Sequence, residues 1–240
     1  MARRSLATLS AIFVILALSP RVGAQAPSVD DLVARNLQAM GGREKMEAVT
    51  TLKQTGHVEM QGMQGTLTIY SKRPNLLRQE MKMGTMTVVN GFDGETAWII
   101  NPLVGSNAPI VMGGPEADEI KDQSSFDGPL QTYKAKGGRL ELEGEDTLDG
   151  RKVEHLKLTD KAGSVVRIYL DAATALVVRL VKDVSSVTLT QDLLDYRDVD
   201  GLKVPFTIRT SVNGVPMGEI TVDKIEFNVP MDDALFRMKR

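Results

Sequence analysis

The chain has no cysteine among its 240 residues. This absence excludes disulfide bonds, thiolate nucleophiles and cysteine-based metal sites. It also excludes the acylated cysteine that anchors bacterial lipoproteins to a membrane. Aromatic residues are scarce at 5% of the chain, with a single tryptophan, whereas there are 12 methionines. Soft, flexible apolar side chains are therefore unusually prominent in this sequence.

Histidine is nearly absent as well. His57 and His155 lie far apart and match no HExxH or related spacing, so we expect no metal site and no cofactor. The segment 195–201 resembles the start of a calcium loop. Tyr196 and Thr207 fall at the first and last ligand positions of that template, where carboxylates are required, so the template fails. No GxSxG, Walker or GxGxxG motif is present. These absences favour a protein that is not an enzyme, although a hydrolase whose nucleophile and base meet only in the folded chain stays an alternative.

Charge of either sign is not in excess. Lysine and arginine number 29 and aspartate and glutamate 31, which gives a formal net charge of −2. A chain with this balance has no electrostatic footprint for nucleic acid, so we expect no nucleic-acid partner.

The only long apolar stretch lies at the N-terminus. Arg3 and Arg4 precede an apolar run over residues 6–18, and Pro20 ends it. The run is too short to span a bilayer as a stable helix, and small residues follow it, as in a secretory signal peptide. We predict a signal peptide over residues 1–24 and a mature domain over residues 25–240. Cleavage after Ala26 and an uncleaved anchor are the alternatives.

Most of the mature chain has the alternating pattern of β-strands. In residues 202–212, apolar side chains share one face and polar side chains the other. Short turns punctuate the pattern, which favours antiparallel neighbours. The expected two-residue turns are Asn90-Gly91, Asp93-Gly94, Asp149-Gly150, Asp200-Gly201 and Asn213-Gly214. We predict a mainly β domain (α+β) with one antiparallel sheet of about eleven strands, which must curl.

Helices are expected in two places. Ser28 is a suitable cap for a first helix, and a short second turn over residues 43–49 follows Gly41-Gly42. The segment 101–138 is a long excursion between strands, with one helix starting near Glu116 and another near residues 128–133. An excursion of this kind is usually a lid or a binding loop.

One strand face is rich in methionine. Leu77, Met81 and Met83 share a face, and Trp98 and Ile100 share a face of a later strand. Methionine suits surfaces that accept variable apolar ligands, with ordinary core packing as the alternative.

Two motifs in this region resemble those of the LolA-type outer-membrane lipoprotein carriers. They are "KRPNLLRQEM", which contains the run 72–76, and "NGFDGETAWIINPLVG". Asp93, Gly94, Trp98, Asn101 and Pro102 match the second motif. Beyond Pro102 the resemblance is one of layout.

The resemblance implies an incomplete antiparallel β-barrel closed by a helical lid, which carries acyl chains of lipoproteins across the periplasm. The arginine that matches Arg73 holds the lid shut in this family by bonding to its backbone. By parity, Arg73 shares a face with Leu67 and Ile69. The expected cavity lining is Leu67, Ile69, Leu77, Met81, Met83, Trp98 and Ile100.

The expected partners follow from the same resemblance. They are acylated lipoproteins or lipids, an inner-membrane release complex and an outer-membrane acceptor, with the carrier itself a monomer. Leu77 and Gln79 stand where the family often has aromatic residues, so the cargo stays open. A carrier of another lipid or glycolipid and a lipoprotein-sensing regulatory domain are the alternatives.

Overall fold

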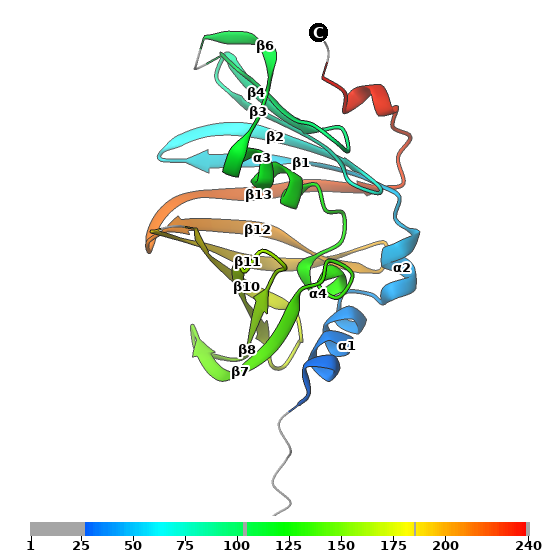
Figure 1. Ribbon diagram of the computed structural model, residues 1–240, viewed down its shortest axis with the longest axis vertical. Coiled ribbons are helices and arrows are strands. Elements are labelled where there is room, and N and C mark those ends of the chain that lie inside the picture. Colours follow the sequence, from blue (N-terminus) through cyan, green and yellow to red (C-terminus); the bar gives the residue numbers. More distant parts are fainter. Residues whose placement is uncertain (1–26, 103–104, 185, 239–240) are drawn as a thin grey trace, which may run out of the picture.

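The computed structural model describes residues 27–102, 105–184 and 186–238. Within these residues it contains one antiparallel sheet of 13 strands, in the spatial order β6-β5-β4-β3-β2-β1-β13-β12-β11-β10-β9-β8-β7 (Figure 1). The sheet is open, with β6 and β7 at its two edges. The predicted mainly β, incomplete antiparallel barrel with a helical lid is therefore confirmed, with thirteen strands instead of about eleven.

The strands are short in the first half of the chain and longest near its C-terminus. The first six are β1 (Thr51–Met60), β2 (Met63–Lys72), β3 (Leu76–Met83), β4 (Met86–Phe92), β5 (Ala97–Asn101) and β6 (Ser106–Val111). The others are β7 (Arg139–Leu148), β8 (Arg151–Thr159), β9 (Val165–Asp171), β10 (Val177–Val184), β11 (Val187–Val199), β12 (Leu202–Val212) and β13 (Val215–Phe227).

Four of the five predicted turns join strands. At Asp149-Gly150, Asp200-Gly201 and Asn213-Gly214 both residues have positive φ, as a tight hairpin turn requires. Asn90-Gly91 is the exception and lies inside β4. Glycine is needed there for a different reason, because a Cβ at Gly91 would overlap the Trp98 ring.

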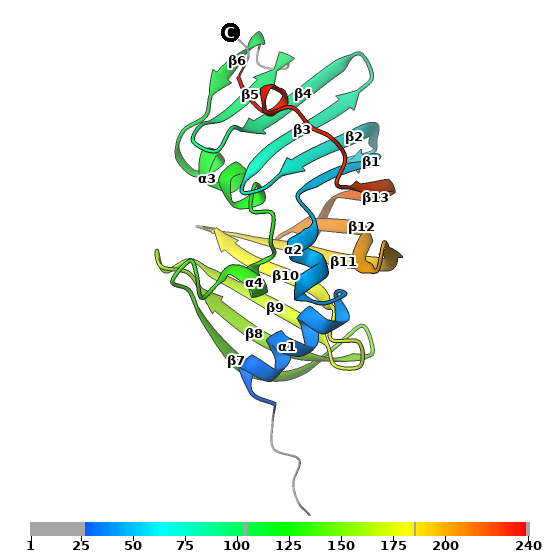
Figure 2. The ribbon, with the colours of Figure 1, turned by 90° about the vertical axis from the view of Figure 1, so that its right-hand side faces the viewer.

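Four short helices lie on one side of the sheet: α1 (Val29–Ala39), α2 (Arg43–Ala48), α3 (Gly114–Gln123) and α4 (Pro129–Thr132). Ser28 begins α1 through a capping box with Asp31, as its sequence predicts. In Figure 2, α1, α2 and α4 lie in front of the half of the sheet that contains β7 to β12, and α3 lies against the other half. No helix in the part of the chain that the structure describes is long and apolar enough to cross a membrane.

The sheet face that carries these helices, here the helix face, holds three apolar clusters, of which the middle one is formed by Phe206, Val222 and Ile225 on β12 and β13. Leu32 of α1 and Leu130 of α4 pack on Leu156, Ile168 and Leu170 of β8 and β9. On the other half, Ile120 of α3 packs on a second cluster, formed by Leu77, Phe92 and Ala97. The helices thus cover a single curved face from its two ends.

The opposite face, here the back face, carries the C-terminal segment. Lys72 donates to the Met231 carbonyl at 3.0 Å. Further along, the Trp98 indole donates to the Phe236 carbonyl at 2.9 Å, and both aromatic side chains are fully buried. Figure 2 shows this segment in red, crossing the strands β2 to β4. The segment therefore supplies the back-face packing that a lone sheet would lack.

Candidate ligand-binding site

Arg73 follows β2 directly and points to the helix face. Its Nε donates to the Val49 carbonyl at 2.7 Å, and its Nη2 donates to the Met46 carbonyl at 3.0 Å. Nη1 and Nη2 each donate to one oxygen of the Asp127 carboxylate at 2.6 Å. The guanidinium also lies 4.4 Å from the centroid of the Phe126 ring. Arg73 therefore joins the end of β2 to α2 and to the segment between α3 and α4.

The chemistry of each partner explains this contact. The Met46 and Val49 carbonyls stand at the end of α2, where the last carbonyls of a helix lack the usual amide four residues on; Met46 accepts instead from the Val49 amide at 3.3 Å. The planar guanidinium matches the carboxylate in a bidentate pair, and the hydrogen bonds that Arg73 donates to Asp127 raise the pKa of Arg73. About a quarter of each side chain remains exposed, 24% for Arg73 and 30% for Asp127. Water can therefore replace these bonds when the segment moves.

A second ionic contact joins α3 to the far half of the sheet. Lys182 of β10 lies 3.1 Å from Glu119 and 3.5 Å from Asp122. It occupies the helix face, where its cross-strand neighbour is Leu189. Burial acts to lower the pKa of Lys182, but its contacts with Glu119 and Asp122 outweigh burial and raise it. The lysine is therefore charged and is neutralised by the helix above it.

Two cavities lie between the helices and the sheet. The inner cavity, of about 180 Å³, is mainly apolar and is lined by Met40, Met46, Val49, Leu52, Phe126, Asp127, Gly128, Gln131, Leu202, Lys203, Val204 and Phe227. The lysine pocket, of about 320 Å³, has Val166, Leu180, Lys182, Leu189 and Gln191 on the sheet side. Its other side is formed by α3, α4, Lys136 and the segment between the helices, and Asp127 and Gly128 line both cavities. The segment that Arg73 holds therefore separates them.

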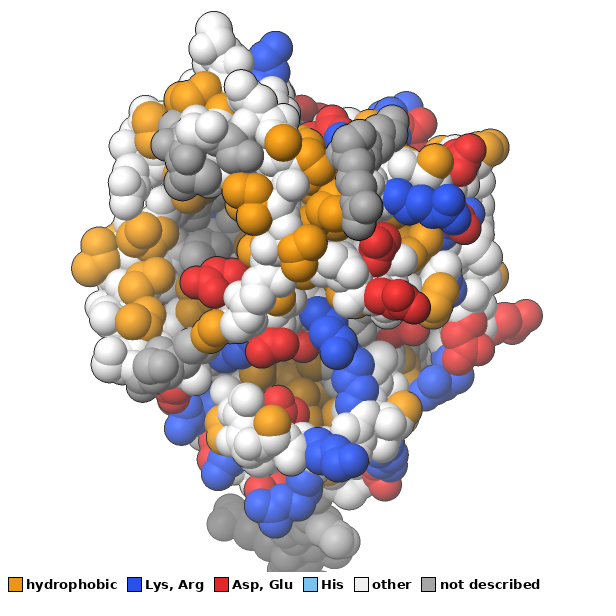
Figure 3. Space-filling view, turned by 45° about the horizontal axis from the view of Figure 1, so that its top comes forward, with side chains coloured by type: hydrophobic (Ala, Val, Ile, Leu, Met, Phe, Trp, Pro, Cys, Tyr) orange, Lys and Arg blue, Asp and Glu red, His pale blue; other side chains and the backbone are white. Residues whose placement is uncertain are grey.

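The surface of the molecule has a hollow that Figure 3 shows. Hydrophobic side chains lie at its floor, and charged side chains lie around its edge. An amphiphile with an apolar chain and a polar head group fits this distribution.

Five of the seven predicted lining residues lie together on the helix face, although none of the seven lines the inner cavity or the lysine pocket. Leu67 pairs with Met81 across β2 and β3, and Ile69 and Leu77 pack in the cluster under α3. Met83 lies on the same face two residues after Met81. Leu77 and Leu67 are buried, whereas both methionines are partly exposed.

Trp98 and Ile100 are placed elsewhere, and their prediction as lining residues was wrong. Ala97 packs under α3, so the next residue must point to the opposite face. Trp98 lies there beneath the C-terminal segment, and Ile100 shares its side of β5. Successive side chains of a strand point to opposite faces, so an alternation that is offset by one residue from the expected one places both side chains on the back face.

Exposed apolar side chains continue the helix face beyond the helices. They form an apolar rim, composed of Met60, Met63, Met86, Val187 and Val215. Met60 opposes Met63, and Val215 opposes Val212, at turns that lie on the left of Figure 1, away from α1 and α2. Val215 is 61% exposed and Met63 58%. The uncovered end of the helix face is therefore apolar.

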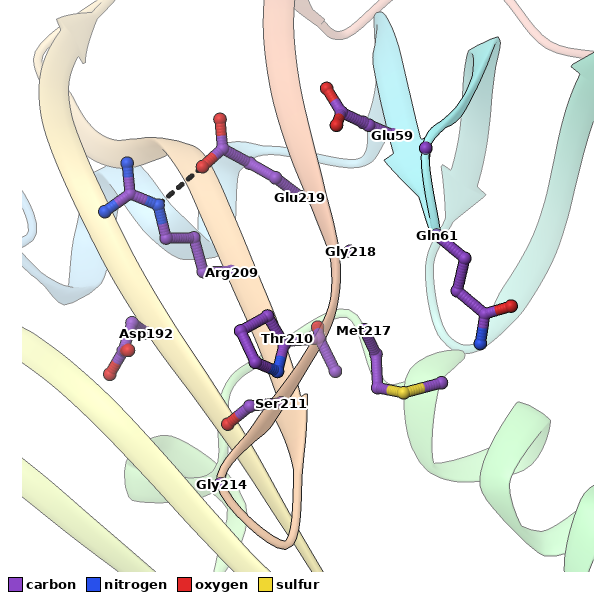
Figure 4. Close-up of a pocket in the computed structure, with 12 residues that line it drawn as sticks. Glu59, Gln61, Asp192, Arg209, Thr210, Ser211, Gly214, Met217, Gly218 and Glu219 are labelled. Atoms are coloured by element: carbon purple, nitrogen blue, oxygen red, sulfur yellow. Dashed lines mark hydrogen bonds and ion pairs between the residues drawn. The ribbon is translucent and has the colours of Figure 1, made fainter.

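A cavity of about 630 Å³ at the β12–β13 hairpin has a different character. Glu59, Glu219, Arg209 and Asp192 line it and are successive cross-strand neighbours on the back face. Figure 4 shows the Arg209–Glu219 ion pair and the other acidic side chains around it. These charges suit water better than an acyl chain. Among the described side chains, no group of three or more His, Cys, Asp or Glu could hold a metal ion.

Asp127, Glu119 and Lys182 were not predicted as site residues. Asp127 and Glu119 lie within the helical excursion, where many acidic residues occur. Lys182 had a detectable signal, since it stands two residues after Leu180 on the apolar side of a strand. A charged residue on such a face needs a partner from another element.

Several solved structures are similar to this chain. No protein-family model matches the sequence, and no curated protein matches it. Among solved structures, a LolA superfamily protein from Nitrosomonas europaea aligns with a TM-score of 0.60 at 11% identity, over 88% of this chain and 98% of that chain. The fold is LolA-like.

Two further structures share the LolA-like fold. A DUF1329 family protein from Desulfovibrio piger aligns with a TM-score of 0.60 at 13% identity, over 87% of this chain and 97% of that one. A domain from Vibrio parahaemolyticus, named for outer-membrane lipoprotein sorting, aligns with a TM-score of 0.55 at 11% identity, over 85% and 97%. The LolA-like fold thus extends over nearly the whole described chain.

Proposed function

We propose that this protein is a non-enzymatic, monomeric carrier that shields acyl chains between its helix face and the helices above it. The observation that carries the proposal is an apolar sheet face under a cover held by two reversible ionic contacts. A carrier needs such a cover, because cargo must enter and leave.

The energetics favour a cover that opens under the influence of cargo. Ile120 is the buried apolar residue of α3, at 6% exposure, and burial of one such side chain stabilises by ~1.5–3 kcal/mol. The partly exposed Lys182–Glu119 contact adds ~0–1 kcal/mol, and the bidentate Arg73–Asp127 pair adds ~1–3 kcal/mol. An acyl chain gains ~0.8 kcal/mol per buried CH₂ group. Burial of about five methylene groups therefore offsets the lifting of α3.

The biological setting belongs to the same proposal. Residues 1–24, proposed as a signal peptide, lie outside the described residues, and residues 25–240 are the proposed mature domain. The proposed location is the periplasm. The proposed cargo is the acyl chains of lipoproteins, received from an inner-membrane release complex and delivered to an outer-membrane acceptor. Carriage of another lipid or glycolipid is the second candidate.

Met81 provides the test. Met81→Asp introduces a carboxylate without a partner into the helix face, where it is costly to bury. We expect the affinity for a fluorescent fatty-acyl probe to fall by at least about tenfold. Thr66→Asp is the matched control, because Thr66 is exposed on the back face of the adjacent strand. Equal probe affinity in Met81→Asp and Thr66→Asp would contradict this lining, and the absence of probe binding to the wild type would refute the carrier.

Native mass spectrometry then identifies the cargo. Protein purified from its own periplasm is weighed with whatever it holds. An acylated protein supports lipoprotein carriage, whereas a bound glycolipid or phospholipid supports the second candidate.

A further inference from the structure

Lys182 is in an unusual position for a lysine. It lies on the helix face with Leu180 on its own strand and Leu189 opposite. Its side chain is 26% exposed, whereas those of Glu119 and Asp122 are 42% and 68% exposed. The lysine is therefore the buried member of this group, and its ammonium depends on the carboxylates for compensation.

The partners of Lys182 belong to the cover and not to the sheet. Glu119 and Asp122 lie on α3, which packs on the opposite half of the sheet through Ile120. When α3 lifts, both carboxylates leave with it. The ammonium then stands alone in an apolar floor, where an anion from another molecule is the natural replacement.

The surroundings of Lys182 match an anionic amphiphile. Val166, Leu180 and Leu189 supply an apolar floor for a chain, and Lys136 supplies a second cation at the edge of the same pocket. The volume of about 320 Å³ fits a head group and the first part of a chain. A carboxylate or phosphate next to an acyl chain would satisfy both parts of the pocket.

We infer that Lys182 binds the anionic head group of acyl cargo, in competition with Glu119 and Asp122 of α3. This inference rests on the proposed carrier function. In the empty protein the two carboxylates occupy the ammonium and hold α3 down. Once a carboxylate or phosphate of the cargo has replaced them, they repel it, as do Glu116 and Asp118 of the same helix. Head-group binding and displacement of the cover are thus a single event.

The first experiment compares two probes with the same chain. A fluorescent C16 fatty acid carries the anion, and its methyl ester does not. We expect the wild type to bind the acid on the order of tenfold more tightly, and Lys182→Gln to lose this preference while binding the ester at least as tightly as the wild type does. Lys182→Arg keeps the charge and should retain the preference. Lys224→Gln, an exposed back-face lysine paired with Glu226, is the control and should behave as the wild type.

The second experiment removes the competitor. Glu119→Gln combined with Asp122→Asn leaves Lys182 free of carboxylates. We expect this variant to bind the fatty acid roughly fivefold more tightly than the wild type and the ester by a smaller factor, because release of α3 helps both probes but only the acid gains a free ammonium. A lower affinity for the acid would overturn the inference, because the carboxylates would then not compete with the head group.

Displacement of the acid probe by unlabelled compounds identifies which kind of molecule supplies the anion. Displacement of the acid probe by lysophosphatidylglycerol but not by lysophosphatidylcholine supports a phospholipid head group, and displacement by unlabelled fatty acid alone supports a free carboxylate. Displacement by inorganic phosphate as effective as that by either lipid overturns the inference, since the chain would contribute nothing. Equal binding of acid and ester to the wild type also overturns the inference about Lys182 but leaves the proposed carrier function standing. Absence of binding of either probe overturns both the inference and the carrier function.

Discussion

Replacement of Arg73 by leucine should loosen the lid segment, defined as residues 114–132, which span α3 and α4. The change removes four hydrogen bonds, two to the Asp127 carboxylate and two to the Met46 and Val49 carbonyls. It leaves an apolar side chain of moderate size beside the inner cavity. Arg73→Lys should be intermediate, because it keeps the charge but loses the planar fork.

The expected magnitude follows from exposure. Hydrogen bonds to charged groups contribute ~1.5–3 kcal/mol where water is excluded. The two bonds to the Asp127 carboxylate join Arg73 to the lid segment, whereas the Met46 and Val49 carbonyls belong to α2 and its C-cap. The Arg73 and Asp127 side chains are 24% and 30% exposed, so both groups recover water as the lid segment opens. We therefore expect a loss of ~1–3 kcal/mol in the free energy that holds the segment down. This corresponds to a roughly fivefold to 150-fold increase in its open population.

Hydrogen exchange measures this population directly. Amides of the lid segment, such as that of Ser124, which donates to Ile120 at 2.9 Å, should exchange faster by the same factor. Amides of β8 and β9 should keep wild-type rates. Cargo should still be taken up, but transfer to acceptor membranes should slow, because closure no longer helps to expel it.

A matched arginine provides the control. Arg78 lies on the back face, where it donates to the Glu80 carboxylate and to the Leu235 carbonyl, which belongs to a C-terminal 3₁₀-helix (Asp233–Leu235) and not to the lid segment. Arg78→Leu should leave exchange of the lid segment unchanged. Wild-type exchange and wild-type transfer in Arg73→Leu would show that Arg73 does not hold the helices.

Two further predictions concern the domain as a whole. Burial raises the pKa of Tyr196, whose hydroxyl donates to the Val177 carbonyl. Its stabilising contribution is thus complete below the unfolded pKa of ~10 and is lost as the pH rises above it. Urea unfolding between pH 8 and about 11 should show this loss in the wild type and a smaller one in Tyr196→Phe. Mass measurement of the exported chain should give an unlipidated protein starting at or near Gln25; a retained N-terminal segment or an added acyl mass would contradict the proposed maturation.

Local patterns predicted most elements of this fold, although the sheet has thirteen strands instead of about eleven and β6 lies within the predicted excursion 101–138. Alternation with a period of two and glycine-containing turns predicted the strands, because both reflect the backbone conformation of neighbouring residues. Ser28 predicted the start of α1 for the same reason. Parity also placed Leu67 and Ile69 on one face with Arg73, since all three belong to one continuous stretch of chain.

The alternation of side chains within one strand does not predict which face of the sheet a side chain of another strand occupies. Trp98 is apolar, as are Ile99 and Ile100, so β5 offers no alternation from which a face could be read. The C-terminal segment, 138 residues further along, decides the matter by covering Trp98 from the back face. The prediction of a turn at Asn90-Gly91 was wrong for a related reason. Gly91 lies inside β4, and the space beside it is filled by the ring of Trp98, which belongs to another strand.

The sequence by itself determined a sheet of hairpins with an apolar face, a helical excursion and an arginine at the end of β2. Only the tertiary structure decided what that arginine and the lysine of β10 hold. Asp127 is 54 residues from Arg73, and Glu119 is 63 residues from Lys182. Partners so far apart are brought together by the curvature of the sheet and the packing of α3 and α4, which no local pattern encodes. The residues that close the site are therefore visible only in the fold, whereas the apolar strands beneath them are readable in the chain.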